Sequence, residues 1–293
     1  MKRCLKCNRA FEGIHWSCPD CKHQPGQIGQ VPVFAPDLAR NNSGFKASYF
    51  APLAAKEEGH FWFRARNELI LWTLEKFGPN ISSFMEIGCG TGFVLQGIAH
   101  RFPDIRLVGS EIFAEGIFFA AKRIPRGEFL QMDACQIPYV HEFDAIGAFD
   151  VIEHIDDDET VLQQIGQSLK PGGLLFLTVP QHRWLWSAVD DHACHVRRYT
   201  ARELHAKLRR AGFFVLYSTS FIVSLLPAML AYRLLQRGEK NTFNPHEGLN
   251  IHPLLNRIFE KLLRLELGMI RLGASFPAGG TRMVVAIKTD KNQ

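Results

Sequence analysis

The sequence lacks a long hydrophobic run, a secretory leader and a strong excess of charge of either sign. Its longest apolar stretch, residues 221–235, is interrupted by Ser224, Pro227 and Arg233 and is too short to cross a bilayer unaided. The first residues carry positive charge without the apolar core that follows it in a leader. A formal net charge of +5 over 293 residues is modest, since nucleic-acid-binding chains usually carry a denser basic patch. These absences favour a globular protein for which an acidic partner is permitted and not required.

A disulfide framework is also disfavoured, because the seven cysteines are odd in number and unevenly placed. Four of them form the pairs Cys4-x-x-Cys7 and Cys18-x-x-Cys21. Two such turns each place two thiolates on one side of a loop, and together they match the tetrahedral site that structural zinc prefers. So short a module cannot bury a core, so we expect the metal to supply its folding free energy. We predict a zinc ribbon over residues 1–27 and a reducing, cytoplasmic location.

The most informative stretch is an apolar strand that breaks into three alternating glycines, Gly88, Gly90 and Gly92, before a helix. Glycines at the exit of a parallel strand let the backbone approach a ligand, and the next helix offers free N–H donors. Two common nucleotide loops are excluded, because Phe93 replaces a glycine of the dinucleotide fingerprint and no lysine is present to grip a phosphate. Glu86 would repel a pyrophosphate but suits a ligand with a cationic end.

This stretch resembles motif I of the class I S-adenosylmethionine-dependent methyltransferases, Glu-x-Gly-x-Gly-x-Gly. That cofactor has no phosphate, and its sulfonium and ammonium suit Glu86. Another Rossmann-type cofactor, or a bare tight turn, is the alternative. The resemblance implies an α/β fold, with a doubly wound, seven-stranded Rossmann-like sheet whose last strand is antiparallel. We expect the strands near residues 81–87, 105–111, 127–134, 144–149, 170–180, 212–217 and 281–288.

Acidic residues close the next two predicted strands. Glu111 lies 19 residues beyond Gly92, where a carboxylate can accept both ribose hydroxyls. In the family, an Asp followed by a free amide, here Asp133 and Ala134, binds adenine. The alternatives are a helix-start carboxylate for Glu111 and a turn cap for Asp133. The predicted cofactor-binding residues are Glu86, Gly88, Cys89, Gly90, Gly92, Glu111, Ile112, Asp133, Ala134 and Phe149.

Two clusters of charged and polar residues follow the fourth and fifth strands, and the groups that react should lie there. Methyl transfer from a sulfonium is an in-line displacement that requires an oriented acceptor and, for a hydroxyl acceptor, a base. Residues 184–200 resemble the Leu-Trp-Ser…Asp…His-x-x-Arg-Arg-Tyr stretch of one family subgroup, which borders the acceptor pocket. We predict His195 as the base, with Arg198 and Tyr199 orienting an anionic or hydroxyl acceptor. His154, after the fourth strand, is the second candidate for the base.

The stretch around His154 resembles motif IV of the Methyltransf_11-like branch. Some O-methyltransferases with a Glu-x-x-Glu-His turn here bind a divalent cation, helped by a later histidine. Glu153 and His154 match that turn, His195 matches the later histidine, and Asp150 departs from it. Such a cation would lower the pKa of an acceptor hydroxyl.

Two further segments flank the predicted site. His60, Trp62, Arg64 and Asn67 resemble a stretch seen before motif I in a bacterial subgroup, and form either a lid over the cofactor or a helix packed on the sheet edge. The stretch 221–276, mostly helical in pattern, is a predicted cap. Its apolar first part either contacts lipid at a membrane surface or packs on the neighbouring cap helix.

These observations predict an enzyme. A linker at 28–59 joins the ribbon to a methyltransferase domain at 60–220 and 277–290, interrupted by the cap. The acceptor is expected to be a small molecule, a glycan or a lipid-linked compound. Two rivals stay open: a non-catalytic cofactor-binding adaptor, and a nucleic-acid methyltransferase or binder that uses the ribbon. The chain lacks the Asn/Asp-Pro-Pro-Tyr/Phe turn of enzymes that methylate base amino groups.

Overall fold

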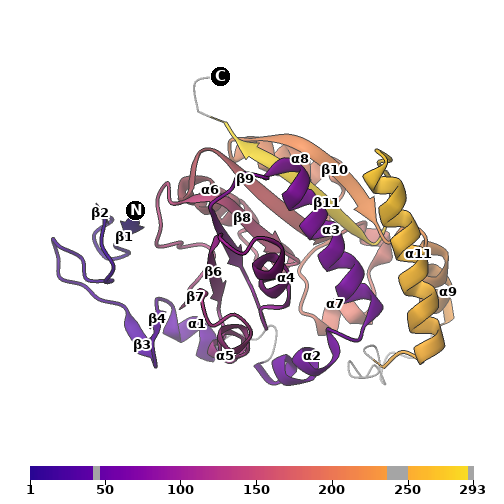
Figure 1. Ribbon diagram of the computed structural model, residues 1–293, viewed down its shortest axis with the longest axis horizontal. Helices are drawn as coiled ribbons and strands as arrows, with labels where there is room; N and C mark the ends of the chain where they lie inside the picture. Colours follow the sequence, from indigo (N-terminus) through magenta and orange to yellow (C-terminus); the bar gives the residue numbers. More distant parts are fainter. Residues whose placement is uncertain (42–46, 236–249, 290–293) are drawn as a thin grey trace.

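A nine-stranded sheet with helices on both faces forms the centre of the computed structural model, which describes residues 1–41, 47–235 and 250–289 (Figure 1). Seven of its strands follow the order β10-β11-β9-β8-β5-β6-β7. They are β5 (Ser83–Ile87), β6 (Arg106–Glu111), β7 (Glu128–Gln131), β8 (Phe143–Phe149), β9 (Leu169–Pro180), β10 (Phe213–Phe221) and β11 (Thr281–Lys288).

The direction of the strands determines where a ligand can bind. From β7 to β9 all neighbours pair in parallel, whereas β11 is antiparallel to both β9 and β10, which confirms the predicted antiparallel last strand. The chain runs outward from β5 through β6 to β7, then returns to place β8 on the other side of β5. This reversal opens a crevice at the carboxyl ends of β5 and β8, the usual ligand position in such sheets.

The predicted count of seven strands was wrong, because β3 (Gly26–Ile28) and β4 (Val31–Val33) extend the sheet beyond β7. The proline- and glycine-rich composition of this stretch predicted only a linker. The edge of β7, however, offers unpaired backbone groups to any extended segment. The Phe34 amide donates to the Gln131 carbonyl at 2.9 Å, and the Gln131 side chain bonds both backbone groups of Ala35.

Helices cover both faces of the sheet and bury an apolar cluster on each. One face carries α3 (Phe61–Phe77), α4 (Phe93–Arg101), α5 (Ala114–Arg123) and α11 (Pro253–Arg271), and the other carries α6 (Asp158–Ser168) and α8 (Ala201–Arg210). The other helices are α1 (Pro36–Asn41), α2 (Phe50–Lys56), α7 (Ala188–His192) and α9 (Leu226–Leu235), with single 3-10 turns at Ala47–Tyr49, Ile152–His154 and Arg183–Leu185.

Helix α3 shows how the sequence positions the site. It begins at Phe61 because His60 caps it: the Trp62 amide donates to the His60 Nδ1 at 3.2 Å. Its buried face includes Leu69 and Leu74. Asn67 is buried against α4, where a Cβ added to Gly97 would lie 2.6 Å from the Asn67 amide nitrogen. The helix thus packs on the sheet and brings its first turn to the carboxyl edge.

The amino-terminal module packs against the sheet domain. Its two-stranded sheet, β1 (Lys2–Arg3) and β2 (Ala10–Phe11), lies at one end of the molecule (Figure 1). The Arg3 amide donates to the Pro138 carbonyl at 2.9 Å. The ring of Trp16 lies 4.8 Å from Phe34 and 5.3 Å from Tyr139. These contacts hold the module against the β7 side of the domain.

At the opposite end of the molecule lie α9 and α11, with α11 in front in this view (Figure 1). They occupy the predicted cap region, and α11 packs on α3 through Leu263, Leu267 and Ile270. The part of the predicted cap at 236–249 lies outside the described residues. In the described ranges, none of the helices has both the length and the hydropathy needed to span a bilayer.

Candidate active site

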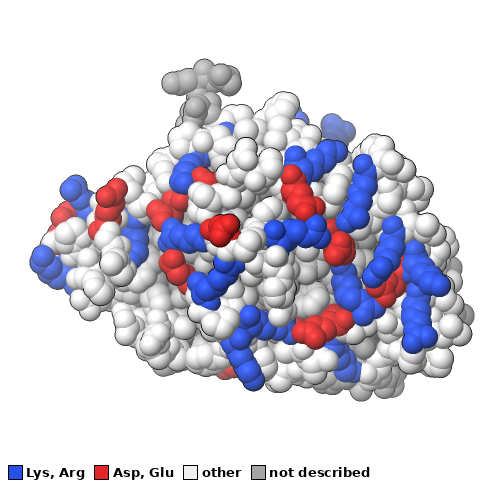
Figure 2. Space-filling view, in the orientation of Figure 1, with Lys and Arg blue, Asp and Glu red and all other residues white. Residues whose placement is uncertain are grey.

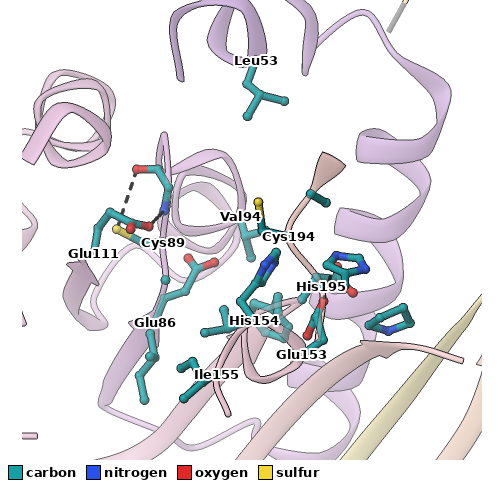
Figure 3. Close-up of a pocket in the computed structure, with 18 of the residues that line it drawn as sticks. Leu53, Glu86, Cys89, Val94, Glu111, Glu153, His154, Ile155, Cys194 and His195 are labelled. Carbon is teal, nitrogen blue, oxygen red and sulfur yellow. Dashed lines mark hydrogen bonds and ion pairs between the residues drawn. The ribbon is translucent and has the colours of Figure 1, made fainter. Parts of the chain in front are cut away.

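A cavity of about 1060 Å³ lies over the carboxyl ends of β5, β6 and β8. Residues from the glycine loop and from the ends of these strands line one side of it. The turn after β8, the loop before α8, and the beginning of α9 line the other side. In Figure 3, Glu86 and Glu111 lie on the first side, whereas Glu153, His154 and His195 lie together on the second. This volume is large enough for a cofactor and a second molecule.

The three glycines of the loop all have positive φ, +65° at Gly88, +52° at Gly90 and +79° at Gly92. Such angles strain any residue with a Cβ. At Gly88 a Cβ would also lie 2.6 Å from the Val151 side chain. Gly92 does not line the cavity; a Cβ there would lie 2.8 Å from the Cα of Ala120, so this glycine permits close packing of α4 on α5.

Glu86 is a buried carboxylate that faces the cavity (Figure 3). Its Oε2 has no hydrogen-bond partner among the described residues. Burial raises the pKa of Glu86 well above its usual range, although Arg66 acts to lower it. A buried acid without a partner is costly for the fold, so the site is suited to a ligand that brings hydrogen-bond donors or positive charge.

Glu111 and Asp133 lie at successive strand ends along the same side. Glu111 accepts from the amides of Gly90 at 3.1 Å and Ile112 at 2.8 Å, and burial raises its pKa. Asp133 accepts from the Cys135 amide at 2.8 Å. This contact caps a turn, which was the alternative role that the sequence analysis gave for Asp133. Each carboxylate oxygen has two lone pairs, so these contacts leave acceptor capacity toward the cavity.

The structure brings together nine of the ten predicted cofactor-binding residues. Those that line the cavity are Glu86, Gly88, Cys89, Gly90, Glu111, Ile112, Asp133, Ala134 and Phe149.

His195 lies on the opposite side of the cavity and is held by Asp190. The His195 Nδ1 donates to the Asp190 Oδ1 at 2.9 Å, since a carboxylate can only accept. Burial would raise the pKa of Asp190, but hydrogen bonds from His195 and Arg198 outweigh it and hold the pKa at about 2. The anionic Asp190 therefore selects the tautomer of His195 whose Nε2 is free to accept a proton.

The two residues predicted to orient an acceptor are engaged elsewhere. Arg198 lines the cavity, but its Nε and one terminal nitrogen donate to Asp190 at 2.7 and 3.0 Å. The other terminal nitrogen donates to the Gln181 carbonyl at 3.1 Å. Tyr199 does not line the cavity, because its hydroxyl donates to Asp158 at 2.7 Å within the core. Their positions support a role in holding the loop rather than contact with an acceptor.

A second polar cluster contains Glu153, His154 and His195, whose potential ligand atoms all lie within 4.8 Å of one another. Both oxygens of Glu153 lack a hydrogen-bond partner in the described structure. Burial raises the pKa of Glu153, and the negative charge of Asp150 raises it further. Burial, together with the charge of His195, lowers the pKa of His154 to about 4. The carboxylate of Asp150 lies instead 2.6 Å from the guanidinium of Arg66, so Asp150 is not part of this cluster.

Sequence reasoning missed three charged residues of the site, Arg66, Glu57 and Asp190. Arg66 lines the cavity and faces Asp150 from α3. Glu57, just after α2, accepts from the Thr91 hydroxyl and from Arg123, each at 2.7 Å, and so fastens α2 over the glycine loop. Two of them lie in stretches that carried a signal: Arg66 in the stretch that resembles a lid, and Asp190 in residues 184–200, whose resemblance includes an Asp. The predicted lid residue Trp62 does line the cavity, whereas His60 serves as the helix cap.

Outside the cavity, the four amino-terminal cysteines converge. The Sγ atoms of Cys4 and Cys21, and those of Cys7 and Cys18, are 3.6 Å apart, and all four lie within 4.8 Å of one another. A tetrahedral ion with metal–sulfur bonds of about 2.3 Å would place its sulfurs about 3.8 Å apart. The cluster therefore has the dimensions of a four-thiolate metal site.

Comparison with known families matches residues 53–218 to a methyltransferase domain. The match covers more than half of the chain, which therefore belongs to this methyltransferase family. Within it, the chain is 28% identical over 106 residues to a trans-aconitate 2-methyltransferase of Variovorax paradoxus, covering 36% of this chain and 41% of that protein. It is also 28% identical over 166 residues to a protein of Mycolicibacterium smegmatis named “Probable S-adenosylmethionine-dependent methyltransferase”, covering 54% and 61%. The chain spans about half the length of these relatives.

Among solved structures, a phosphoethanolamine N-methyltransferase 2 of Haemonchus contortus, in complex with S-adenosyl-L-methionine, superposes with a TM-score of 0.57. The identity is 18%, and the superposition covers 88% of this chain and 60% of that one. A likeness at this identity shows a shared fold, the Rossmann-like methyltransferase sheet.

Proposed function

We propose that this protein transfers the methyl group of S-adenosylmethionine to an oxygen or nitrogen of a small-molecule, glycan or lipid-linked acceptor. The observation that carries the proposal is Glu86, a buried carboxyl group that faces the cavity beside the glycine loop and whose Oε2 has no hydrogen-bond partner among the described residues. A cationic ligand would compensate it, whereas a pyrophosphate would not. Membership of the methyltransferase family supports the same cofactor.

The chain's own residues would each hold one part of that cofactor. Glu86 suits the cationic amino-acid end, and Glu111 retains lone pairs for the ribose hydroxyls. Asp133 and the amide of Ala134 suit the adenine edge. The glycine loop brings the backbone close, because no Cβ projects from Gly88 or Gly90. When bound, the cofactor supplies an electrophilic methyl group.

On the acceptor side, we assign the general base to His195. Its Nε2 accepts a proton from the acceptor hydroxyl or amine as the new bond forms, and the anionic Asp190 stabilises the resulting imidazolium. The Asp190 carboxylate and Arg198 hold the ring in place. His154, whose ring centre lies 4.7 Å from that of His195, is the alternative base.

A divalent cation at Glu153, His154 and His195 is a second assignment for the same cluster, favoured by the unpartnered Glu153. Asp150, which the sequence placed with Glu153 and His154, lies outside the cluster because it pairs with Arg66, whereas His195, predicted as the later histidine, belongs to it. In that case the histidines act as ligands, and the chelator EDTA abolishes turnover until Mg²⁺ or Mn²⁺ is restored. With His195 as a metal-independent base, EDTA leaves turnover at saturating cofactor unchanged.

We assign a structural zinc ion to Cys4, Cys7, Cys18 and Cys21. Their sulfur separations support it, and Phe11 is the one residue other than cysteine in the module's own buried cluster, which is too small to fold the module without metal. Metal analysis of the purified protein should find one zinc per chain, and substitution of Cys18 by serine should remove it.

The proposed function is tested by isothermal titration calorimetry with S-adenosylmethionine and its demethylated product. Glu111→Ala should weaken binding by about 1–3 kcal/mol, or roughly 5- to 150-fold, because hydrogen bonds to the ribose are lost. Glu115→Ala is the matched control, since Glu115 is exposed on α5 and does not line the cavity. If the wild-type protein binds neither ligand, the proposal is wrong.

Labelled cofactor and fractionated cell extract then identify the acceptor. Transfer of label to an extract component supports the enzyme. Binding without transfer to any fraction favours the adaptor, and label on RNA or DNA favours the nucleic-acid methyltransferase. A steep salt dependence of RNA or DNA binding would support the same alternative.

A further inference from the structure

Helix α11 exposes a continuous apolar stripe on the side that faces away from α3. Its side chains recur every three or four residues, so they lie on one face of the helix. Leu265 is 67% exposed, and Leu272, just after the helix, is 91% exposed. The members of this stripe, called here the α11 stripe, are Leu254, Leu255, Ile258, Leu262, Leu265, Met269 and Leu272.

The buried face of α11 is separate from this stripe. Leu263, Leu267 and Ile270 pack into the core against α3. Glu266, also buried, accepts from the amides of Val223 at 3.1 Å and Ser224 at 2.8 Å, which fastens α11 to the segment that leads into α9. The buried face thus packs α11 on the rest of the protein, and the α11 stripe takes no part in that packing. In the described part of the chain, nothing covers the stripe.

Basic side chains border the α11 stripe along one edge. They are Arg257, Lys261, Arg264 and Arg271, all exposed. Figure 2 shows blue side chains gathered over α11. Arg264 pairs with Glu260 and Arg271 with Glu68, whereas Arg257 and Lys261 form no ion pair with a described residue. The two acids of α11, Glu260 and Glu266, are both engaged within the protein.

An apolar face bordered by unpaired cations fits a surface that offers hydrocarbon and negative charge together. A second copy of the chain fits less well. A twofold contact through the α11 stripe would bring two sets of these cations together, and Glu260, which already pairs with Arg64 and Arg264, is the one acid of α11 outside its buried face. The charge pattern therefore favours a lipid surface over a dimer.

The location of the stripe relates it to the cavity. Helix α9 also exposes an apolar side chain, Leu230, while its Met229 lines the cavity. Ile222, at the end of β10, also lines the cavity. Glu266 of α11 accepts from the amides of Val223 and Ser224, which lie between these two lining residues, so α11 is fastened to the segment that borders the acceptor side of the cavity.

We infer that the α11 stripe and its basic edge dock this protein on an anionic lipid surface, next to the acceptor side of the cavity. One part of this inference rests on the proposed function, namely that docking next to the cavity favours a lipid-linked acceptor. Docking itself requires neither cofactor nor methyl transfer, so the two can fail independently.

The test is flotation of the full chain with phosphatidylcholine vesicles, with and without phosphatidylglycerol. The protein should float with the anionic vesicles and bind pure phosphatidylcholine more weakly. Leu265→Asp should lower the vesicle partition coefficient by about tenfold or more, because a buried leucine contributes more than one factor of ten. Phe118→Asp is the matched control, because Phe118 is 53% exposed on α5, far from the stripe. This substitution should leave flotation unchanged.

A charge-reversed variant, Arg257→Glu with Lys261→Glu, separates the two contributions. It should lose the preference for anionic vesicles and keep the weak binding to neutral ones. Circular dichroism spectra and melting temperatures should be the same for every variant, which shows that each one folds whether or not the protein binds the cofactor. The inference is overturned if the wild-type chain does not float, or if Leu265→Asp floats as well as it does. A dimer in sedimentation analysis that Leu265→Asp dissociates, without vesicle binding, would make the stripe an interface between copies.

Discussion

Asp190 determines the geometry of the acceptor side of the cavity, because it fixes two side chains at once. It accepts from His195 on one oxygen and from Arg198 on both. The pair of Asp190 and His195 has the orientation of a base held by a carboxylate, and its neighbour Asp191 is exposed.

We therefore predict that Asp190→Asn lowers kcat by about 10²- to 10⁴-fold and leaves the cofactor dissociation constant unchanged. The amide no longer selects the tautomer of His195 that accepts a proton. Steady-state kinetics and calorimetry measure the two quantities. Asp191→Asn, the same substitution one residue later, should affect neither. Equal turnover of wild type and Asp190→Asn would exclude His195 as the base.

His154 predicts a specific acid sensitivity of the fold. Burial lowers its pKa from 6.5 to about 4, so the folded protein resists protonation there while the unfolded chain accepts the proton. The contribution to stability is complete above pH 6.5 and is lost as the pH falls toward 4. Between pH 7 and pH 4.5 this one group should cost about 2 kcal/mol of unfolding free energy.

Urea unfolding of the wild type and of His154→Gln at both pH values measures this contribution. Protonation of the other groups lowers the unfolding free energy of both proteins equally, so the difference between the two proteins gives the contribution of His154. The variant should lose about 2 kcal/mol less than the wild type between the two pH values. Identical losses would show that His154 is protonated in the folded state.

At this scale, the sequence predicted residues whose role follows from their place beside a strand end. Glu86, Glu111 and Asp133 were found from the glycine loop and from strand spacing, and all three line one cavity. Glu57 and Arg66 were not, because their partners Arg123 and Asp150 lie far along the chain. Arg198 and Tyr199 were recognised as residue types, but a sequence does not show where a donor points.

Among the secondary-structure elements, the amino-terminal module is joined to the cofactor side of the cavity. From the cysteine cluster the chain runs through β3 and β4 to Phe34, whose amide donates to Gln131 at the end of β7. Leu38 of α1, four residues further on, lines the cavity close to Asp133. A metal that folds the module therefore also supports this wall.

Removal of the metal should consequently weaken cofactor binding without touching a cofactor contact. We expect Cys18→Ser, or treatment with a zinc chelator, to raise the cofactor dissociation constant by about 3- to 10-fold, corresponding to roughly 1 kcal/mol of lost support. Calorimetry measures the change. Zinc should restore the affinity of the chelated protein, and Mg²⁺, which thiolates bind poorly, should not. Unchanged affinity in the metal-free protein would mean that the module and the cavity are independent.

Two strands illustrate why some elements were predicted from the sequence and others were not. Residues 283–287 form an uninterrupted apolar run, and the strand that contains them was located correctly as β11 (Thr281–Lys288). Strand β4 contains Pro32 and only three residues, so it carries no pattern of its own. It is extended because β7 offers an open edge, a condition that depends on the assembled sheet.

Across the whole molecule, the cavity is bounded by segments from distant parts of the chain. Helix α2 contributes Phe50 and Leu53, the glycine loop contributes Gly88, and the cap contributes Met229. A ligand that contacts several of these segments should stabilise the whole fold, since it binds the folded state alone.

S-adenosylmethionine at about 100 times its dissociation constant should therefore add about 2.7 kcal/mol to the unfolding free energy and raise the melting temperature. Scanning calorimetry measures the shift. Hydrogen exchange should slow at residues 50–56, because Glu57 fastens α2 over the bound loop. ATP is the control nucleotide, and its phosphates should be repelled by Glu86. A larger shift with ATP than with S-adenosylmethionine would contradict the assigned cofactor.

The sequence by itself determined the class of fold, the glycine loop and its acidic neighbours, and the pairing of the four amino-terminal cysteines into two knuckles. These features depend on short-range spacing, which dictates strand ends, tight turns and thiolate pairs. The tertiary structure alone decided that the sheet has nine strands, that Asp190 holds His195 while Asp150 pairs with Arg66, and that α11 keeps an apolar stripe exposed. Each of these depends on which distant segments meet, and local sequence patterns carry no information about that.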